Sequence, residues 1–299
     1  MTRIAMTLIL LCAVSTSLQA AIDVFACEPE WAALAEMIGG EAVSVTAATT
    51  AQQDPHHIQA RPSLIARMRR AELVICTGAD LEAGWLPLLL RRAGNPAVQP
   101  GRPGYLEAAT AVTLLDRPAD LDRAAGDVHA QGNPHIQTSP HNIAAVARAL
   151  QDRLARVDPS HADGYRQRFD DFLQQWHAAT RRWEEAAGPL RGMRVAVQHS
   201  SWVYLNDWLG LEQVATLEPK PGVPPSTADL ENLLEQLGTE PPAAILRAAW
   251  QDARPAEWLS GRTGIPVVEL PFTVGGSAAA PDLYGLFEAT LEALLAVRR

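Results

Sequence analysis

Three histidines and one aspartate of this chain occur where parallel α/β folds place functional groups. His199 ends the run 195–199, at the carboxyl end of a strand expected at 194–197, and His56 and His135 lie in proline-containing loops. Asp282 follows a loop rich in glycine and alanine, at the start of the last expected helix. Open parallel sheets bind ligands outside the carboxyl ends of their strands, where these four loops are expected to meet. Imidazole nitrogens and a carboxylate oxygen suit tetrahedral Zn²⁺, so we expect these four side chains to form a zinc site.

Each of these residues has a simpler interpretation when it is taken alone. A loop histidine is usually a surface residue, and Asp282 could merely cap its helix. The wide spacing of the four side chains also differs from the short spacings of a zinc finger. The site hypothesis therefore depends on the four loops meeting on one side of the expected sheets.

The other five histidines are expected to lie outside the site. His161 and His177 are expected to be solvated on a long polar helix. His57 is expected to face solvent or to support the ligand beside it, and His141 is expected to start a helix. The fifth, His129, is the only histidine of the loop 117–132. For His129, transient metal capture and a mobile surface position are both open, and the surface position is favoured because the loop offers few donors.

The elements that would position the site alternate between short β-branched runs and longer helical runs. In the first half, strands are expected at 22–27, 42–46 and 72–76, and helices at 30–38, 63–70 (capped by Ser63) and 82–92. In the second half, strands are expected at 194–197, 212–217, 244–247 and 267–270, and helices at 202–209, 227–236, 256–262 and 281–297. This alternation predicts two parallel sheets with helices on both faces.

A polar stretch at 160–187 separates the two halves. Its apolar residues recur at intervals of three and four, which is the pattern of one helix face: Tyr165, Phe169, Phe172, Leu173, Trp176 and Ala179. A helix of about 28 residues would span ~40 Å and could bridge two lobes, and the alternative is one more core helix of a single domain. We therefore expect an α/β protein with two similar lobes, 21–158 and 189–299. One long rigid helix at 159–188 would join them, with the metal site in the cleft between them.

Length, composition and the N-terminal segment agree with an exported two-lobe protein. The 299 residues correspond to about two domains. With 25 basic and 34 acidic residues, the net charge of −9 argues against a nucleic-acid partner. Residues 1–20 combine Arg3, a short apolar run and small residues before Ala20, which predicts a cleaved secretory signal and not a membrane span. The mature chain would carry a charge of −10, since Arg3 is the one charged residue removed, and would lie in the periplasm.

Two cysteines remain after the signal, and each ends an expected strand. An oxidising compartment favours a disulfide between Cys27 and Cys76, and two buried thiols are the alternative. Cys12 lies inside the apolar run and is expected to be removed with the signal.

Several segments, taken in order, carry a family resemblance. They are Asp54-Pro55-His56 followed by Arg61-Pro62-Ser63, Asn133-Pro134-His135 with Ser139-Pro140-His141-Asn142, His199, the run 218–226 and the run 282–287. Over essentially the whole mature chain, the sequence resembles the periplasmic zinc-binding solute receptors of ABC importers, a metal-binding cluster of the solute-binding proteins. The resemblance implies two α/β lobes joined by one long helix. It also implies that His56, His135, His199 and Asp282 bind the metal.

Within this family, manganese-binding members look different at the third ligand, where a carboxylate replaces the histidine. His199 therefore favours Zn²⁺, because imidazole suits zinc whereas hard Mn²⁺ prefers oxygen.

The chain departs from many zinc-binding members in two places. The loop before the second ligand holds only His129, and Ser200 stands where an acidic residue is usual. Asp54 remains a candidate for orienting a ligand imidazole.

The resemblance implies a receptor and not an enzyme. Such a receptor would capture Zn²⁺ in the periplasm and deliver it, as a monomer, to an ABC transporter permease in the inner membrane. A periplasmic metallochaperone is a further candidate partner. The alternatives are a zinc-dependent hydrolase with an open coordination position, a receptor for another divalent metal such as Mn²⁺, and an adhesin or organic-solute receptor. The chain lacks HExxH and other compact hydrolase motifs, and a fourth protein ligand would close the site.

Overall fold

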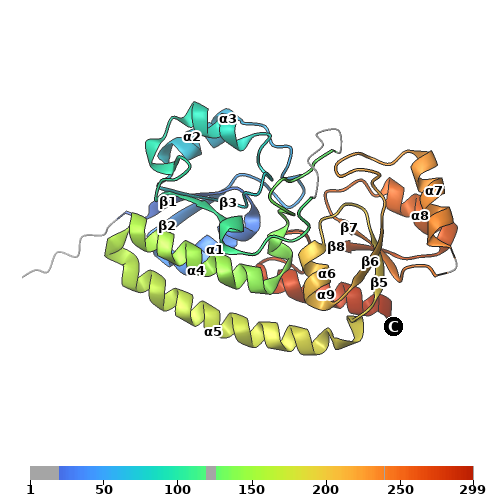
Figure 1. The fold of residues 1–299 in the computed structure, drawn as a ribbon. Coiled ribbons are helices and arrows are strands. Elements are labelled where there is room, and N and C mark those ends of the chain that lie inside the picture. The colour runs from blue at the N-terminus through green and yellow to red at the C-terminus, as the bar shows by residue number, and fades with distance from the viewer. Residues whose placement is uncertain (1–19, 119–125, 239, 299) are drawn as a thin grey trace, which may run out of the picture.

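The computed structural model describes residues 20–118, 126–238 and 240–298, so the signal segment expected at 1–20 lies outside it except for Ala20. Figure 1 shows two α/β lobes side by side, with a long helix that runs beneath both. Every pairing between the named strands is parallel. The expected fold class is confirmed. None of the described helices combines the length and the apolar character needed to cross a bilayer.

The N-terminal lobe is built on a four-stranded sheet in the order β2-β1-β3-β4. Its strands are β1 (Ile22–Ala26), β2 (Val43–Ala47), β3 (Leu73–Cys76) and β4 (Tyr105–Glu107). Its helices are α1 (Pro29–Gly39), α2 (Pro62–Arg70), α3 (Leu86–Ala93) and α4 (Pro140–Val157). The central strands β1 and β3 are apolar along most of their length, as parallel strands covered on both faces must be. Strand β4 and helix α4 are additions to the expected elements.

The C-terminal lobe repeats this topology in the order β6-β5-β7-β8. Its strands are β5 (Arg194–Val197), β6 (Glu212–Thr216), β7 (Ala244–Ala248) and β8 (Val267–Leu270). Its helices are α6 (Val203–Leu209), α7 (Thr227–Leu237), α8 (Arg254–Thr263) and α9 (Leu283–Arg298). In both sheets the chain order reverses beside the first strand, and loops that leave neighbouring strands diverge at such a point to form a ligand crevice.

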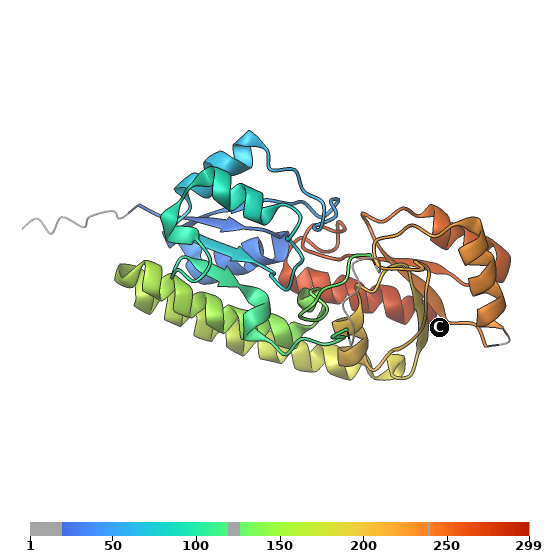
Figure 2. The same cartoon turned by 45° about the horizontal axis from the view of Figure 1, so that its top comes forward.

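Helix α5 (Ala162–Ala186) joins the lobes with 25 residues, a length of about 37 Å. It buries the expected apolar face, although Leu173 is only partly covered. Trp176 of this face stacks on Phe172 and meets Phe287 of α9 edge-on. Helix α9 also contacts α1, and Figure 2 shows it passing from beside the N-terminal lobe into the C-terminal lobe. One apolar core therefore runs through both lobes, and the domain boundaries at 158 and 188 stay predictions.

Two local expectations are wrong. Helix α2 is not capped by Ser63, because it starts one residue earlier, with Arg61 as its N-cap residue and Pro62 in the first turn. The helix expected at 82–92 begins only at Leu86. The preceding chain forms turns instead, because the carboxylate of Glu82 accepts hydrogen bonds from the backbone N–H groups of Thr77 and Gly78.

Cys27 and Cys76 form the expected disulfide, with their Cα atoms 4.7 Å apart. It joins the residue after β1 to the last residue of β3, and both side chains are fully buried. The bond therefore fastens the two central strands of the N-terminal sheet together.

Candidate metal centre

His56 lies in the loop after β2 and is oriented by that same loop. Oδ1 of Asp54 accepts hydrogen bonds from the backbone N of His56 at 3.0 Å and from its Nδ1 at 2.7 Å. Burial raises the pKa of Asp54, but bonding to His56 more than offsets this and leaves the pKa below its usual value. Since a carboxylate only accepts, Nδ1 carries the proton and Nε2 the lone pair in the neutral form of His56. This is the orienting role expected of Asp54.

His135 lies in a loop that is bonded to both lobes. Oδ1 of Asn133 accepts a hydrogen bond from the backbone N of His135 at 3.0 Å, and Nδ2 of Asn133 donates to the carbonyl of Ser200 at 2.7 Å. The Tyr204 hydroxyl donates to the carbonyl of Asn133 at 2.6 Å. His135 is 1% exposed, and its ring meets Phe272 edge-on with the ring centroids 5.3 Å apart. These contacts fix His135 between the lobes.

His199 lies two residues after β5, where the order of the C-terminal sheet reverses. Glu218, in the segment after β6, places Oε2 2.7 Å from Nδ1 of His199. The same oxygen accepts a hydrogen bond from the backbone N of Gly222 at 2.8 Å. Glu218 therefore supplies the orienting carboxylate that Ser200 does not.

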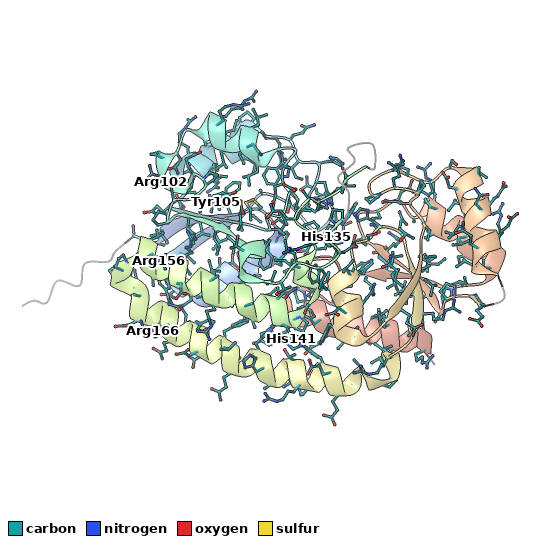
Figure 3. The ribbon with its side chains drawn as sticks, viewed as in Figure 1. Arg102, Tyr105, His135, His141, Arg156 and Arg166 are labelled. Atoms are coloured by element: carbon teal, nitrogen blue, oxygen red, sulfur yellow. A yellow bond between two sulfur atoms is a disulfide. The ribbon has the colours of Figure 1, made fainter. Side chains whose placement is uncertain are left out.

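The three expected histidines meet between the lobes. One ring nitrogen from each of His56, His135 and His199 lies within 4.8 Å of the other two. Their ring centroids are 5.4, 5.6 and 5.8 Å apart, and Figure 3 shows His135 in the region between the lobes. Burial, followed by the neighbouring imidazoles, lowers the pKa of His135 well below its usual value. Buried imidazoles that converge in this way can offer lone pairs to a single cation such as Zn²⁺.

Asp282 does not join this group. Its side chain is exposed, and Oδ1 accepts a hydrogen bond from the backbone N of Gly285 at 2.8 Å. It lines a different cavity, together with residues of α1 and the loop after β8. A carboxylate is favourable at a helix N-terminus because the first N–H groups there lack backbone partners. The structure therefore does not support Asp282 as the fourth ligand, and the capping interpretation describes it instead.

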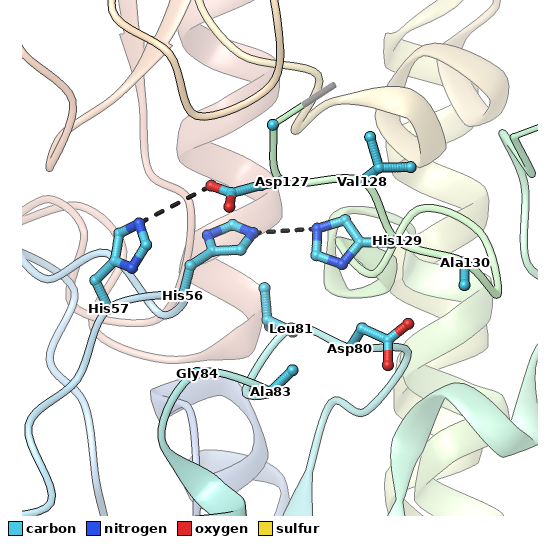
Figure 4. Close-up of a pocket in the computed structure, with 11 residues that line it drawn as sticks. His56, His57, Asp80, Leu81, Ala83, Gly84, Asp127, Val128, His129 and Ala130 are labelled. Atoms are coloured by element: carbon cyan, nitrogen blue, oxygen red, sulfur yellow. Dashed lines mark hydrogen bonds and ion pairs between the residues drawn. The ribbon is translucent and has the colours of Figure 1, made fainter. Parts of the chain in front are cut away.

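His129 lies against the site, in contrast to the surface position that its sequence context favours. Its Nε2 is 3.3 Å from Nε2 of His56, and Figure 4 shows the two rings facing each other. Its ring centroid lies 5.3 Å from that of His56 and 6.3 Å from that of His135. Burial is the largest effect that lowers the pKa of His129 to about 4, and the imidazoles of His56 and His199 lower it further. A hydrogen bond with the backbone of Ala79 opposes these effects and is smaller. In the sequence, the only indication of this position is that His129 is the one histidine of a long loop.

The remaining four histidines lie outside the group. His57 and His177 are exposed, as expected, whereas His141 lies 2.9 Å from Glu184 and the half-buried His161 lies 2.6 Å from Asp158. His161 is therefore paired with a carboxylate and not simply solvated. None of these four residues belongs to the convergent group of ring nitrogens in the described part of the chain.

Two cavities open beside the histidines. The larger has a volume of about 530 Å³, and the side chains of its wall include His56, His57, Asp80, Asp127 and His129 (Figure 4). The smaller has a volume of about 180 Å³, and its wall includes Asp127, His129, His135 and His199. Asp127, Val128 and His129 thus form a wall that the two cavities share.

A two-lobe α/β fold with converging imidazoles between its lobes defines a metal-binding receptor. The family described as "ZnuA: Zinc-uptake complex component A periplasmic" matches residues 24–297, and the chain belongs to this family of periplasmic metal-binding receptors. Comparison with curated protein sequences finds no match.

Solved structures share the fold at low sequence identity. A crystal structure of ZnuA superposes with a TM-score of 0.77 and 22% identity, covering 92% of this chain and 98% of that chain. A zinc-bound deletion mutant of ZnuA superposes with a TM-score of 0.75 and 22% identity, covering 93% of this chain and 97% of that chain. A manganese-bound periplasmic metal-binding protein from Candidatus Liberibacter asiaticus superposes with a TM-score of 0.74 and 16% identity, covering 92% of this chain and 99% of that chain. At these identities the likeness shows the fold, and the metals are those of the relatives.

Proposed function

We propose that this protein captures Zn²⁺ in the periplasm and delivers it to an ABC-type permease in the inner membrane. The observation that carries the proposal is the convergence of ring nitrogens from His56, His135 and His199 within 4.8 Å. Two of these imidazoles bond through Nδ1 to Asp54 and Glu218. Carboxylate–histidine pairs of this kind raise ligand basicity and point Nε2 at a metal.

Zinc is the proposed cargo because the converging donors are nitrogens. Imidazole suits Zn²⁺, whereas Mn²⁺ is harder and prefers carboxylate, carbonyl and water oxygens. The fold itself does not decide between these metals, since both a zinc-bound and a manganese-bound protein share it. Cu²⁺ binds nitrogen donors still more tightly, so exclusion of copper would rest on geometry and on supply.

We propose a receptor and not a zinc hydrolase. A hydrolase requires a zinc-bound water beside a general base that is free to take its proton. The carboxylates bonded to the ligand histidines, Asp54 and Glu218, each already face an Nδ1 atom. Family membership also favours binding and release of a metal over chemistry at it.

The remaining parts of the proposal concern export and assembly. Residues 1–20 would be a cleaved signal, 21–158 and 189–299 the two lobes, and 159–188 the rigid bridge. The Cys27–Cys76 disulfide supports an oxidising compartment. The protein would act as a monomer, with the permease and a periplasmic metallochaperone as its partners.

Competition for Zn²⁺ between the metal-free protein and a chromophoric chelator tests the site. We expect one tight site per chain, and His135→Ala should weaken it by more than about 100-fold, since even loss of a supporting residue costs about 10–100-fold. The matched control is His177→Ala, which removes an exposed imidazole from α5. Equal affinities of the wild-type protein and His135→Ala would overturn the proposal.

A further inference from the structure

The three converging histidines leave one corner of a tetrahedral site without a ligand. A zinc site closed to chemistry uses four protein ligands. Asp282 does not fill this corner, because it caps α9. The wall shared by the two cavities holds two side chains that could bind a metal, Asp127 and His129.

The distance between His129 and His56 matches what two ligands of a tetrahedral zinc site require. With Zn–N bonds of about 2.0–2.1 Å, two ligand nitrogens of a tetrahedral site lie about 3.3 Å apart. Nε2 of His129 is 3.3 Å from Nε2 of His56, the atom that the Asp54 bond leaves free for a metal. His129 also lines the smaller cavity together with His135 and His199. His129 therefore lies beside the space that the other three imidazoles surround. Its ring nitrogens are not part of the group that lies within 4.8 Å of one another, so His129 would have to move closer to bind the same ion.

Asp127 is engaged elsewhere. Its Oδ2 lies 3.9 Å from Nε2 of the exposed His57 (Figure 4). The same oxygen packs against Gly222, where a β-carbon would lie only 2.1 Å from it. One oxygen of the Asp127 carboxylate is thus held against Gly222 of the C-terminal lobe and near His57. His129 is the better candidate for the fourth corner.

The backbone holds His129 in place on both sides. Before it, the N–H of Asp127 donates to the carbonyl of Pro221 at 2.9 Å. After it, Gly132 donates to the carbonyl of His129 at 3.1 Å, and Asn133 donates to the carbonyl of Leu115 at 2.8 Å. The same Asn133 supports His135. The position of His129 is therefore coupled to the loop that carries a proposed ligand.

We propose that His129 is the fourth ligand of the cargo metal, so that Zn²⁺ is bound by the imidazoles of His56, His129, His135 and His199. This inference rests on the proposed function and adds a determinant of metal selectivity to it. A set of four nitrogens offers Mn²⁺ no oxygen donor, and it leaves no coordination position open to water. The site would thus hold zinc as cargo without activating it.

X-ray absorption of the zinc-loaded full-length mature protein counts the imidazoles directly. We expect four nitrogen ligands in the wild-type protein, and three nitrogens plus one oxygen from water in His129→Ala. Chelator competition should show Zn²⁺ affinity reduced by about 100-fold or more in His129→Ala, because a direct ligand is lost. Mn²⁺ affinity should fall much less, so the ratio of Zn²⁺ to Mn²⁺ affinity should drop.

Two control variants separate the possible outcomes. His57→Ala removes an exposed imidazole from the same cavity and should leave the affinity and ligand count unchanged. Asp127→Asn should also bind zinc as the wild type does, and loss of one oxygen ligand in that variant would assign the corner to Asp127 and overturn the inference. Three imidazoles in the wild type, with unchanged affinity in His129→Ala, would also overturn it. If His135→Ala still abolishes binding in that case, the proposed function stands without this fourth ligand.

Discussion

Oε2 of Glu218 lies 2.7 Å from Nδ1 of His199, across 19 residues of sequence. Both side chains are largely buried, with 13% and 5% of their side-chain surfaces exposed. In the neutral form of His199 the contact places the proton on Nδ1 and leaves the lone pair on Nε2. The segments that follow β5 and β6 thus supply a proposed ligand and the group that orients it.

Glu218→Gln should weaken zinc binding by about 10–100-fold, as loss of a supporting carboxylate typically does. Glutamine keeps the shape and one acceptor oxygen but removes the negative charge that raises the basicity of His199. The affinity is measured by chelator competition at neutral pH. Glu235→Gln, an exposed substitution on α7, is the matched control. Equal loss in both variants, or none in Glu218→Gln, would contradict this role of Glu218.

Zinc binding should order loops and leave the bridging helix unchanged. Helix α5 contains no proline, and its one glycine, Gly164, lies in the first turn, so nothing interrupts it as a strut. Hydrogen exchange with and without zinc should show added protection at 52–58 and at 127–136, the segments that carry His56, His129 and His135. A large change in radius of gyration on zinc binding, measured by scattering, would contradict a rigid bridge.

The sequence predicts the three histidines and the contact of Asp54 with His56, but not the support that Glu218 gives to His199. His199 is recognisable because it ends a clear strand pattern, and strand ends face ligands in parallel sheets. Glu218 is not recognisable as its partner, because the contact depends on how the chain returns after β6. Asp282 shows the opposite failure. In a sequence, a carboxylate that caps a helix cannot be distinguished from one that binds a metal. Only the fold shows that the loop of Asp282 lies apart from the histidines.

His129 and the late start of α3 show a second limit of local patterns. His129 lies in a loop without periodicity, so its approach to His56 arises from tertiary contacts at Pro221 and Leu115. Glu82 fits a helical pattern in sequence, yet in the structure it bonds the backbone of Thr77 and Gly78. Helix and strand patterns predict the layers of this fold well because those depend on local apolar spacing.

The buried carboxyl of Glu30 should make stability depend on pH. Burial raises its pKa from 4.5 to about 7, although the Thr273 hydroxyl donates a hydrogen bond to it. Between these pH values the folded state holds a proton that the unfolded state releases, so stability falls as pH rises from about 4.5 to above 7. Denaturant unfolding should show that Glu30→Gln gains stability relative to the wild type over this range, by on the order of 3 kcal/mol at most. Parallel pH profiles of the two proteins would contradict a raised pKa.

Removing the disulfide should destabilise the N-terminal lobe without changing the site. The bridge spans 49 residues, and closing a loop of this length stabilises the folded state by about 4 kcal/mol in the chain-entropy treatment. Urea unfolding of a Cys27→Ala, Cys76→Ala double variant should show this loss. A reducing agent should lower wild-type stability to a similar degree and leave the double variant unaffected. An unchanged midpoint in the double variant would contradict the contribution of the bridge.

Direct competition between Zn²⁺ and Mn²⁺ tests the central claim. Metal-free mature protein is dialysed against both ions at equal concentration, and then against a hundredfold excess of Mn²⁺, and the bound metal is measured by mass spectrometry. A site built from converging imidazoles should hold one Zn²⁺ per chain under both conditions. Binding of Mn²⁺ at equal concentrations, or no metal bound at all, would contradict the assignment of this protein as a zinc receptor.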